Sequence, residues 1–169
     1  MLGDRWGSTA AEVARRYPCD RIVARPVLQA WRAVSVDAAC ERVWPWVVQI
    51  RLAPYSYDWI DNLGRRSPQQ LLGLADPVPG DRFTASAGRP LGRVLSVDPG
   101  RELTASIGGV VMSYVLEPEG ARTRLLLKLV ADHGRVVAPL LCLGDLVMAR
   151  RQLLNLKQLA ERVPCPVQA

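Results

Sequence analysis

Residues 44–59 combine aromatic rings with carboxylates, a mixture that could bind or activate a ligand. The chain has 169 residues and few aromatic ones, and half of those lie in this stretch: Trp44, Trp46, Tyr55, Tyr57 and Trp59. Asp58 and Asp61 stand among them. Flat rings with a polar edge suit the wall of a site for fused-ring or polyene ligands, and a carboxylate can polarise a ligand hydroxyl. The alternatives are that the rings pack in the core and that the acids cap a helix or face solvent.

Two further polar residues occur in strand-like segments. Arg32 lies in the alternating segment 27–36, and if its face points inward the guanidinium needs a carboxylate or an acidic ligand. A shift of one residue in register would instead turn Arg32 to solvent. Tyr114 shares a face with Met112 and offers an inward hydroxyl. An enzyme built from these groups would use Tyr114 as acid, Arg32 as anion clamp and Asp58 as base on an already reactive substrate.

The remaining catalytic and metal signatures are weak. His133, the single histidine, follows Asp132 and precedes a glycine, so it is either a general base or a solvated loop residue. Neither a Ser-His-Asp order nor a phosphate loop nor a dinucleotide fingerprint occurs. The spacing of the four cysteines is never C-x-x-C; they are Cys19, Cys40, Cys142 and Cys165. We therefore expect neither a metal site nor a cofactor. A bridge between the first and last of these cysteines would tie the ends of the chain together, but spacing alone does not establish it.

The net charge of +6 and the pI near 9.6 raise the question of an anionic partner. Only two lysines occur and the arginines are spread along the chain, so we expect no nucleic-acid partner. The alternative is contact with a lipid surface or nucleic acid through Arg150, Arg151, Lys157 and Arg162 of the last helical segment.

Two absences in the sequence bear on localisation. No run of eighteen or more apolar residues is present, and the first twenty residues lack an apolar segment behind a basic start. We therefore expect a cytoplasmic protein without a transmembrane segment.

The first half of the chain reads as an arm followed by a strand and helices. Residues 1–26 form an amino-terminal arm with a helix capped at Ser8 or Thr9 and ended by Pro18. After the strand at 27–36, Asp37 offers a cap for a helix that should kink or divide at Pro45. Short helices are expected over 56–64, capped by Ser56, and over 67–74.

The second half reads as an antiparallel meander and a long helix. Turn sequences at 98–100 and 117–120 separate strand-length segments. In the last strand a covered face carries Leu125, Leu127 and Leu129, while a wet face carries Arg122, Arg124 and Lys128. Residues 139–163 form an amphipathic helix whose stripe is Cys142, Leu146, Ala149, Leu153, Leu156, Ala160 and Val163. That stripe should lie on the sheet.

Several stretches carry a resemblance that covers nearly the whole chain: WGST-x-x-EV with YPCD, VWPWVVQI, YSYDWIDNLG, VPGDRF, RTRLLLKL and VMARRQLLNLKQLAE. They resemble actinobacterial members of the SRPBCC superfamily, the START-domain, pollen-allergen and polyketide-cyclase group. The resemblance implies an α+β helix-grip fold over 27–169, a curved antiparallel sheet around the last helix with two short helices after the first strand. The lead-in RLAPYSYDW lacks the glycines common in such relatives.

The resemblance also implies an apolar cavity between sheet and helix. The residues expected at that site are Tyr55, Tyr57, Trp59, Met112, Tyr114, Leu125, Leu127, Leu146 and Leu153. The leading hypothesis is binding, and possible transport, of an apolar or amphipathic small molecule such as a lipid or polyketide, by a monomer or homodimer. The alternative is an enzyme of the polyketide cyclase or dehydratase type, since the fold alone does not choose between them.

Overall fold

The computed structural model describes residues 4–132 and 138–162, and for 138–146 the backbone alone. His133 and Cys165 lie outside the described residues. Among the described residues, no helix is long and apolar enough to cross a membrane.

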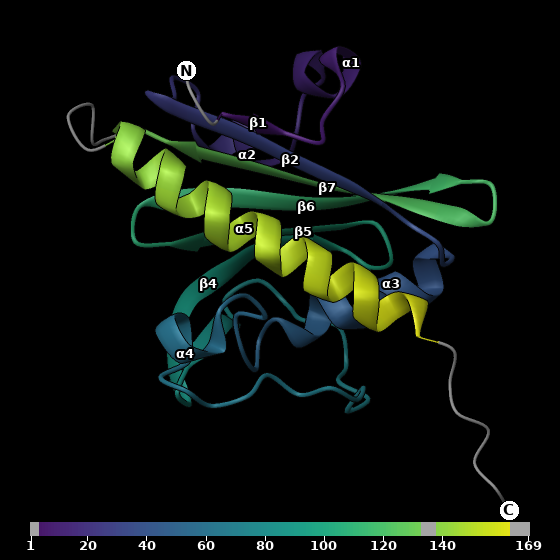
Figure 1. The fold of residues 1–169 in the computed structure, drawn as a ribbon. Helices are drawn as coiled ribbons and strands as arrows, with labels where there is room; N and C mark the ends of the chain where they lie inside the picture. Colours follow the sequence, from purple (N-terminus) through teal and green to yellow (C-terminus); the bar gives the residue numbers. More distant parts are fainter. Residues whose placement is uncertain (1–3, 133–137, 163–169) are drawn as a thin grey trace, which may run out of the picture.

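A seven-stranded sheet forms the body of the molecule (Figure 1). Its spatial order is β1-β2-β7-β6-β5-β4-β3, and every neighbouring pair is antiparallel except β1 and β2. The strands are β1 Arg5–Trp6, β2 Leu28–Val36, β3 Arg82–Ser86, β4 Arg89–Asp98, β5 Glu102–Ile107, β6 Val110–Glu119 and β7 Arg122–Ala131. The expected meander is therefore confirmed, with the short parallel β1 as an addition.

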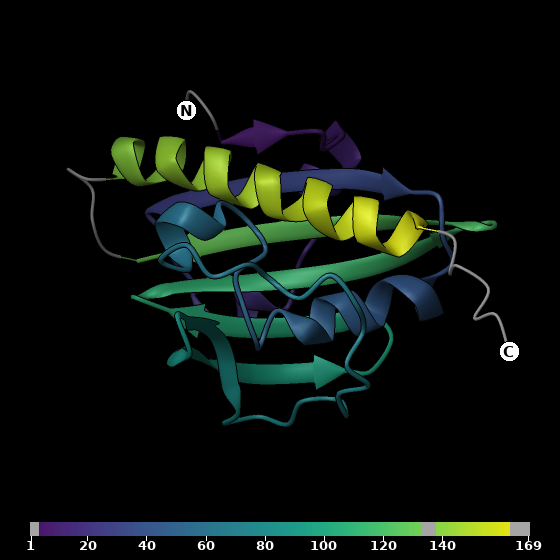
Figure 2. The same ribbon diagram turned by 60° about the horizontal axis from the view of Figure 1, so that its bottom comes forward.

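Helices cover both faces of this sheet. The long helix α5 runs diagonally across one face, and α3 and α4 lie below it on the same side (Figures 1 and 2). The helices are α1 Ala10–Ala14, α2 Cys19–Ile22, α3 Cys40–Gln49, α4 Asp58–Asp61 and α5 Ala138–Glu161. This arrangement is the expected helix-grip fold.

The core between α5 and the sheet follows the periodicity of the sequence. Leu125, Leu127 and Leu129 of β7 are buried on the α5 side, and Val34 of β2 lies with them. Leu153 of α5 is completely buried against them. Side chains alternate across a strand, so the β7 row fixes the register of the inner face.

The opposite face of the sheet is largely covered: the expectation of a wet face was wrong for Lys128, whereas Arg122 is exposed as expected. Tyr17 and Cys19 of the arm pack on Trp31, Leu126 and neighbouring apolar residues of this face. Lys128 is only 4% exposed: its ammonium pairs with Asp20 at 2.6 Å and lies 5.0 Å from the centre of the Trp31 ring. The arm provides both the apolar cover and the counter-charge, since a buried cation needs a partner.

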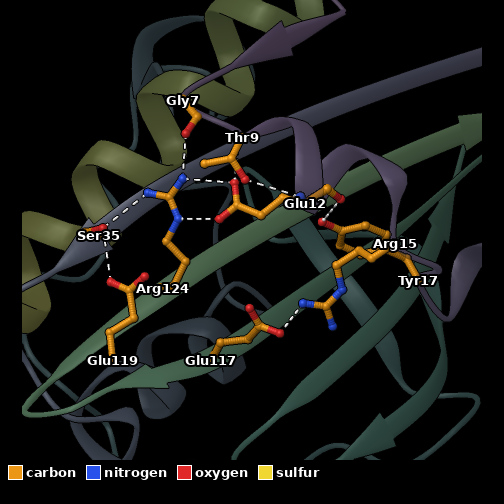
Figure 3. A network of polar contacts seen from close by, with 9 residues as sticks. All are labelled: Gly7, Thr9, Glu12, Arg15, Tyr17, Ser35, Glu117, Glu119 and Arg124. Atoms are coloured by element: carbon orange, nitrogen blue, oxygen red, sulfur yellow. Dashed lines mark hydrogen bonds and ion pairs between the residues drawn. The ribbon is translucent and has the colours of Figure 1, made fainter.

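An ion pair fastens the arm to β7 (Figure 3). Arg124 donates from Nε to Glu12 Oε1 at 2.7 Å and from Nη2 to Glu12 Oε2 at 3.1 Å, a two-pronged contact. Its Nη2 also donates to the Gly7 carbonyl at 2.5 Å. Glu12 accepts a third bond from the backbone of Thr9, which completes the capping box of α1.

The expected helix boundaries need correction at α3. Ala39, not Asp37, is the N-cap residue, and Asp37 instead pairs with Arg122 at 3.6 Å. Helix α3 also runs through Pro45 to Gln49 without dividing.

No helix forms over 67–74, contrary to expectation. The buried side chain of Gln49 takes the backbone bonds that a helix would have made. Its Nε2 donates to the Gln70 carbonyl at 2.9 Å, and its Oε1 accepts from the Leu72 N–H at 2.8 Å. A long-range side chain thus overrides the local preference of the segment.

The Glu12–Arg124 pair predicts a pH-dependent attachment of the arm. The hydrogen bond from Arg124 lowers the pKa of Glu12 from its ordinary 4.5. A lowered pKa means that the stabilisation is complete above about pH 4.5 and is lost as the pH falls through the folded-state pKa. Glu12→Gln keeps the capping oxygen but removes the charge, and should lower the free energy of unfolding at pH 7 by about 1–2 kcal/mol. Urea unfolding should show this difference shrinking towards pH 3; a constant difference would contradict it.

Candidate functional site

A hollow remains between α5 and the sheet, which we call the helix–sheet cavity. Its volume is about 220 Å³. The lining is mostly apolar and comprises Ile50, Pro54, Ser56, Asp61, Phe83, Thr84, Leu91, Ile107, Met112, Tyr114, Leu127, Leu129, Met148, Ala149 and Gln152. The small side chain of Ala149 on the buried stripe of α5 leaves part of this space unfilled.

A polar pair lies inside the helix–sheet cavity. The Tyr114 hydroxyl donates to Gln152 Oε1 at 2.6 Å, and Gln152 Nε2 donates to the Pro54 carbonyl at 2.5 Å. Tyr114 is only 1% exposed. These bonds join the sheet, α5 and the segment before α4, and they place a hydroxyl where a ligand in the cavity would meet it.

Asp61 brings a carboxylate to the same cavity. Ser56 Oγ donates to Asp61 Oδ2, whereas Asp61 Oδ1 is buried and bonds no side-chain donor among the described residues. Burial raises the pKa of Asp61 above its usual value because it disfavours the charged form. An incompletely satisfied acceptor beside an apolar space can receive a hydrogen bond from a ligand.

The segment just before α4 separates the cavity from a second hollow. Tyr55 is 1% exposed and has a left-handed backbone with a φ of 56°. Its hydroxyl accepts from Gln49 Nε2 at 2.7 Å, its carbonyl accepts from Asn155 Nδ2 at 2.9 Å, and burial raises the pKa of its hydroxyl. Tyr55 is thus a core residue that also lines the second hollow.

The second hollow, which we call the arginine cleft, lies between α5 and the segment 55–69. Its volume is about 610 Å³. The lining residues are Tyr55, Ser56, Tyr57, Asp58, Trp59, Gly64, Arg66, Ser67, Gln69, Arg151, Asn155, Gln158, Leu159 and Arg162. Ser56 is common to the cleft and the cavity.

Helix α4 differs from its expected form. It is one turn long, Tyr57 precedes it, and Ser56 is not its cap. Asp58 accepts from the Ser67 backbone at 2.8 Å and from Ser67 Oγ at 2.6 Å, so it holds the following loop. Trp59 is 73% exposed and therefore lies outside the core.

The candidate ligand-binding residues fall into three groups. Met112, Tyr114 and Leu127 line the helix–sheet cavity, and Tyr55, Tyr57 and Trp59 line the arginine cleft. Leu125 and Leu153 are buried core residues outside both linings, and the side chain of Leu146 lies outside the described residues.

The three candidate catalytic residues lie in different places. Tyr114 faces the cavity and Asp58 lies at the cleft. Arg32 does face inward and is 1% exposed, but its Nη1 donates to the carbonyls of Asp4 and Trp31 at 2.8 and 2.9 Å. No hollow described above is lined by all three. Among the described residues, no group of three or more His, Cys, Asp or Glu could hold a metal ion.

Sequence reasoning missed Gln152, Ser56 and Asp61 as cavity residues. Gln152 had a usable signal, because it stands between Ala149 and Leu156 on the buried side of an amphipathic helix. A polar residue at such a position needs a buried partner. Ser56 and Asp61 gave no such signal, since their burial depends on contacts with distant strands and with α5.

Comparison with known proteins supports the fold but not a specific activity. No family model matches the chain, and no curated protein is similar to it in sequence. Solved structures do match. Protein MLL2253 from Mesorhizobium loti has a TM-score of 0.56 at 18% identity and covers 81% of this chain and 99% of its own.

Two other solved structures match to a similar degree. Protein NE0264 from Nitrosomonas europaea has a TM-score of 0.53 at 13% identity over 79% of this chain and 94% of its own. The Aha1 dimer from Colwellia psychrerythraea has a TM-score of 0.53 at 14% identity over 79% and 96%. The chain shares its helix-grip fold with these structures. At these identities the likeness concerns the fold alone.

The buried carboxyl of Asp61 predicts a pH dependence opposite to that of Glu12. Its raised pKa means that the folded protein retains the proton more strongly than the unfolded chain does. Stability is therefore lost as the pH rises from 3.8 through the folded-state pKa. Asp61→Asn keeps an acceptor for Ser56 but cannot ionise, so its free energy of unfolding should exceed that of the wild type at pH 7 and approach it near pH 3.

Urea unfolding across this pH range measures the difference, with Glu12→Gln as a control of opposite slope. A parallel pH profile for Asp61→Asn and the wild type would show that burial does not perturb this carboxyl.

Proposed function

We propose that the protein binds an apolar or amphipathic small molecule whose apolar part occupies the helix–sheet cavity. The observation that carries this proposal is the cavity itself, an apolar hollow between α5 and the sheet that a ligand could fill. Its lining combines apolar side chains with a few convergent polar groups, the usual composition of a ligand pocket.

The volume limits the ligand. The helix–sheet cavity lies below the roughly 300 Å³ at which ordinary ligand pockets begin, although an apolar cavity of roughly 150 Å³ binds benzene. A cavity of about 220 Å³ therefore suits one ring or a short chain, or the end of a larger molecule. This favours a smaller ligand than the polyenes considered from the sequence.

The polar groups supply orientation. Tyr114 and Gln152 already bond each other, so a ligand hydroxyl could join this pair only at one of its remaining sites. Asp61 Oδ1 is a further acceptor at the cavity lining. A weakly polar ligand, with one hydroxyl on an apolar body, matches this set.

The polyketide cyclase or dehydratase alternative gains no specific support. Its acid, anion clamp and base would have to act on one substrate, and Tyr114, Arg32 and Asp58 do not line a common hollow. General acid–base catalysis requires such groups within hydrogen-bond reach of the reacting atoms.

The proposal includes a cytoplasmic location and a monomeric or dimeric state. Cys19 is a completely buried free thiol, and burial raises its pKa to about 11, which keeps it protonated and unreactive. Such a cysteine suits a reducing compartment. A homodimer is compatible with the Aha1 dimer among the similar structures.

A cavity-filling variant tests the binding site. Ala149→Leu adds apolar atoms inside the helix–sheet cavity and should keep the free energy of unfolding within about 1 kcal/mol of the wild type. Saturating benzene should raise the melting temperature of the wild type by mass action and leave that of Ala149→Leu unchanged. Ala11→Leu, which adds the same atoms at an exposed site on α1, is the matched control and should respond like the wild type.

The natural ligand is sought by mass spectrometry of small molecules released from each purified protein. A compound retained by the wild type and Ala11→Leu, but absent from folded Ala149→Leu, would identify it. Equal benzene shifts in all three proteins would place binding elsewhere and refute the cavity assignment.

A further inference from the structure

We propose that the arginine cleft is a separate binding site for an organic anion that carries a flat ring, such as an aromatic carboxylate or phosphate. The cleft is larger than the helix–sheet cavity and differs from it in chemistry. Guanidinium groups, aromatic rings and neutral polar side chains line it, and Leu159 is its single aliphatic side chain.

The charges of the cleft are unbalanced. Arg66, Arg151 and Arg162 line it, and in the part of the chain that the structure describes none of them pairs with a carboxylate. Arg162 donates to Gln69 Oε1 at 3.2 Å, a neutral partner. Asp58 is the single acid of the lining, and its two carboxylate oxygens accept hydrogen bonds from Ser67. The site therefore has an excess of positive charge that an anion would neutralise.

Guanidinium groups also define the kind of anion. Their planar fork of donors matches carboxylate and phosphate groups, which accept two parallel hydrogen bonds. Arg66, Arg151 and Arg162 are all exposed, so their donors are accessible to a soluble anion.

Aromatic rings beside these donors supply a place for a flat apolar group. The guanidinium of Arg151 lies 5.8 Å from the centre of the Tyr57 ring, which orients it by cation–π attraction. Trp59 lines the same cleft and is 73% exposed, so its indole face is accessible to a ligand. A ring placed against Trp59 would remove that apolar surface from water.

The wall on the α5 side is fixed. Asn155 Nδ2 donates to the carbonyls of Tyr55 and Ser56 at 2.9 and 3.2 Å, which ties the helix to the opposite wall. Arg151 and Arg162 lie on the same side of α5, roughly 16 Å apart along its axis. The ring site is at the Arg151 end, where Tyr57 lies.

Neighbouring arginines provide matched controls because they point elsewhere. Arg150 lies over the Trp6 ring at 5.2 Å, on the β1 side of α5. Arg65 lies beside Gly88 in the turn between β3 and β4. Neither lines the cleft.

The test compares two double variants of equal charge. 1-Naphthyl phosphate is titrated by calorimetry into the wild type, Arg66→Gln/Arg151→Gln and Arg65→Gln/Arg150→Gln, with circular dichroism to verify folding. We expect the cleft variant to bind at least roughly tenfold more weakly, the loss of charge-assisted hydrogen bonds, and the control variant to bind within about twofold of the wild type. The neutral analogue 1-naphthol should bind much more weakly than the phosphate to the wild type.

Other outcomes overturn the proposal. Equal weakening in both double variants would mean that only net charge matters. Equal affinities for 1-naphthol and 1-naphthyl phosphate would show that the cleft does not recognise the anionic group. Loss of phosphate binding in Ala149→Leu would place the ring in the helix–sheet cavity and not in a separate site. Binding to phosphatidylglycerol vesicles without binding to soluble naphthyl phosphate would assign the arginines and Trp59 to a membrane surface.

Discussion

The constraint on which the structure depends is that both faces of the central strands are largely buried. In β2 and β7 the residues of the inner row and those of the outer row are both buried, and a two-faced sheet needs a cover on each side. Helix α5 covers the inner face and the amino-terminal arm covers the outer one. Because the arm covers the outer face, the helix–sheet cavity lies on the inner face, beneath α5. The hollow forms where α5 presents Ala149 in place of a larger side chain.

The segment 54–61 lies between two hollows of different chemistry, the helix–sheet cavity and the arginine cleft. Gln152 and Asn155 of α5 bond its carbonyls on successive turns of the helix, and Gln49 of α3 bonds the Tyr55 hydroxyl. The left-handed backbone at Tyr55 is unusual for a bulky residue and persists because these contacts determine it. One result is that the Tyr55 ring enters the core. The other is that Trp59 points away from it, so that the apolar cavity and the charged cleft lie on either side of one short segment.

Patterns within short stretches of sequence predicted the elements that short-range interactions determine, namely strands, turns and the buried stripe of α5. The turn sequences delimited β5 to β7, and the helical stripe placed Leu153 and Leu156 in the core. The alternation of β2 grouped Arg32 with Val34 but left open which way that face points. The errors arise where distant side chains decide. Residues 67–74 stay irregular because Gln49 takes their backbone bonds, and Lys128 is buried because Asp20 of the arm neutralises it. The cleft could not be predicted for the same reason. Its two walls, the segment 55–69 and α5, are far apart in the sequence and come together only in the folded chain.

The distribution of positive charge explains why a net charge of +6 does not describe a single basic surface. Arg124 and Lys128 are committed to carboxylates of the arm, and Arg32 to its backbone. The four basic residues of the last helix also divide: Arg150 and Lys157 turn towards β1 and β2, whereas Arg151 and Arg162 turn into the cleft. A phosphate-tracking stripe would need them on one side. The excess charge that remains beside aromatic rings is therefore local, and it is suited to a small anion more than to an extended polyanion.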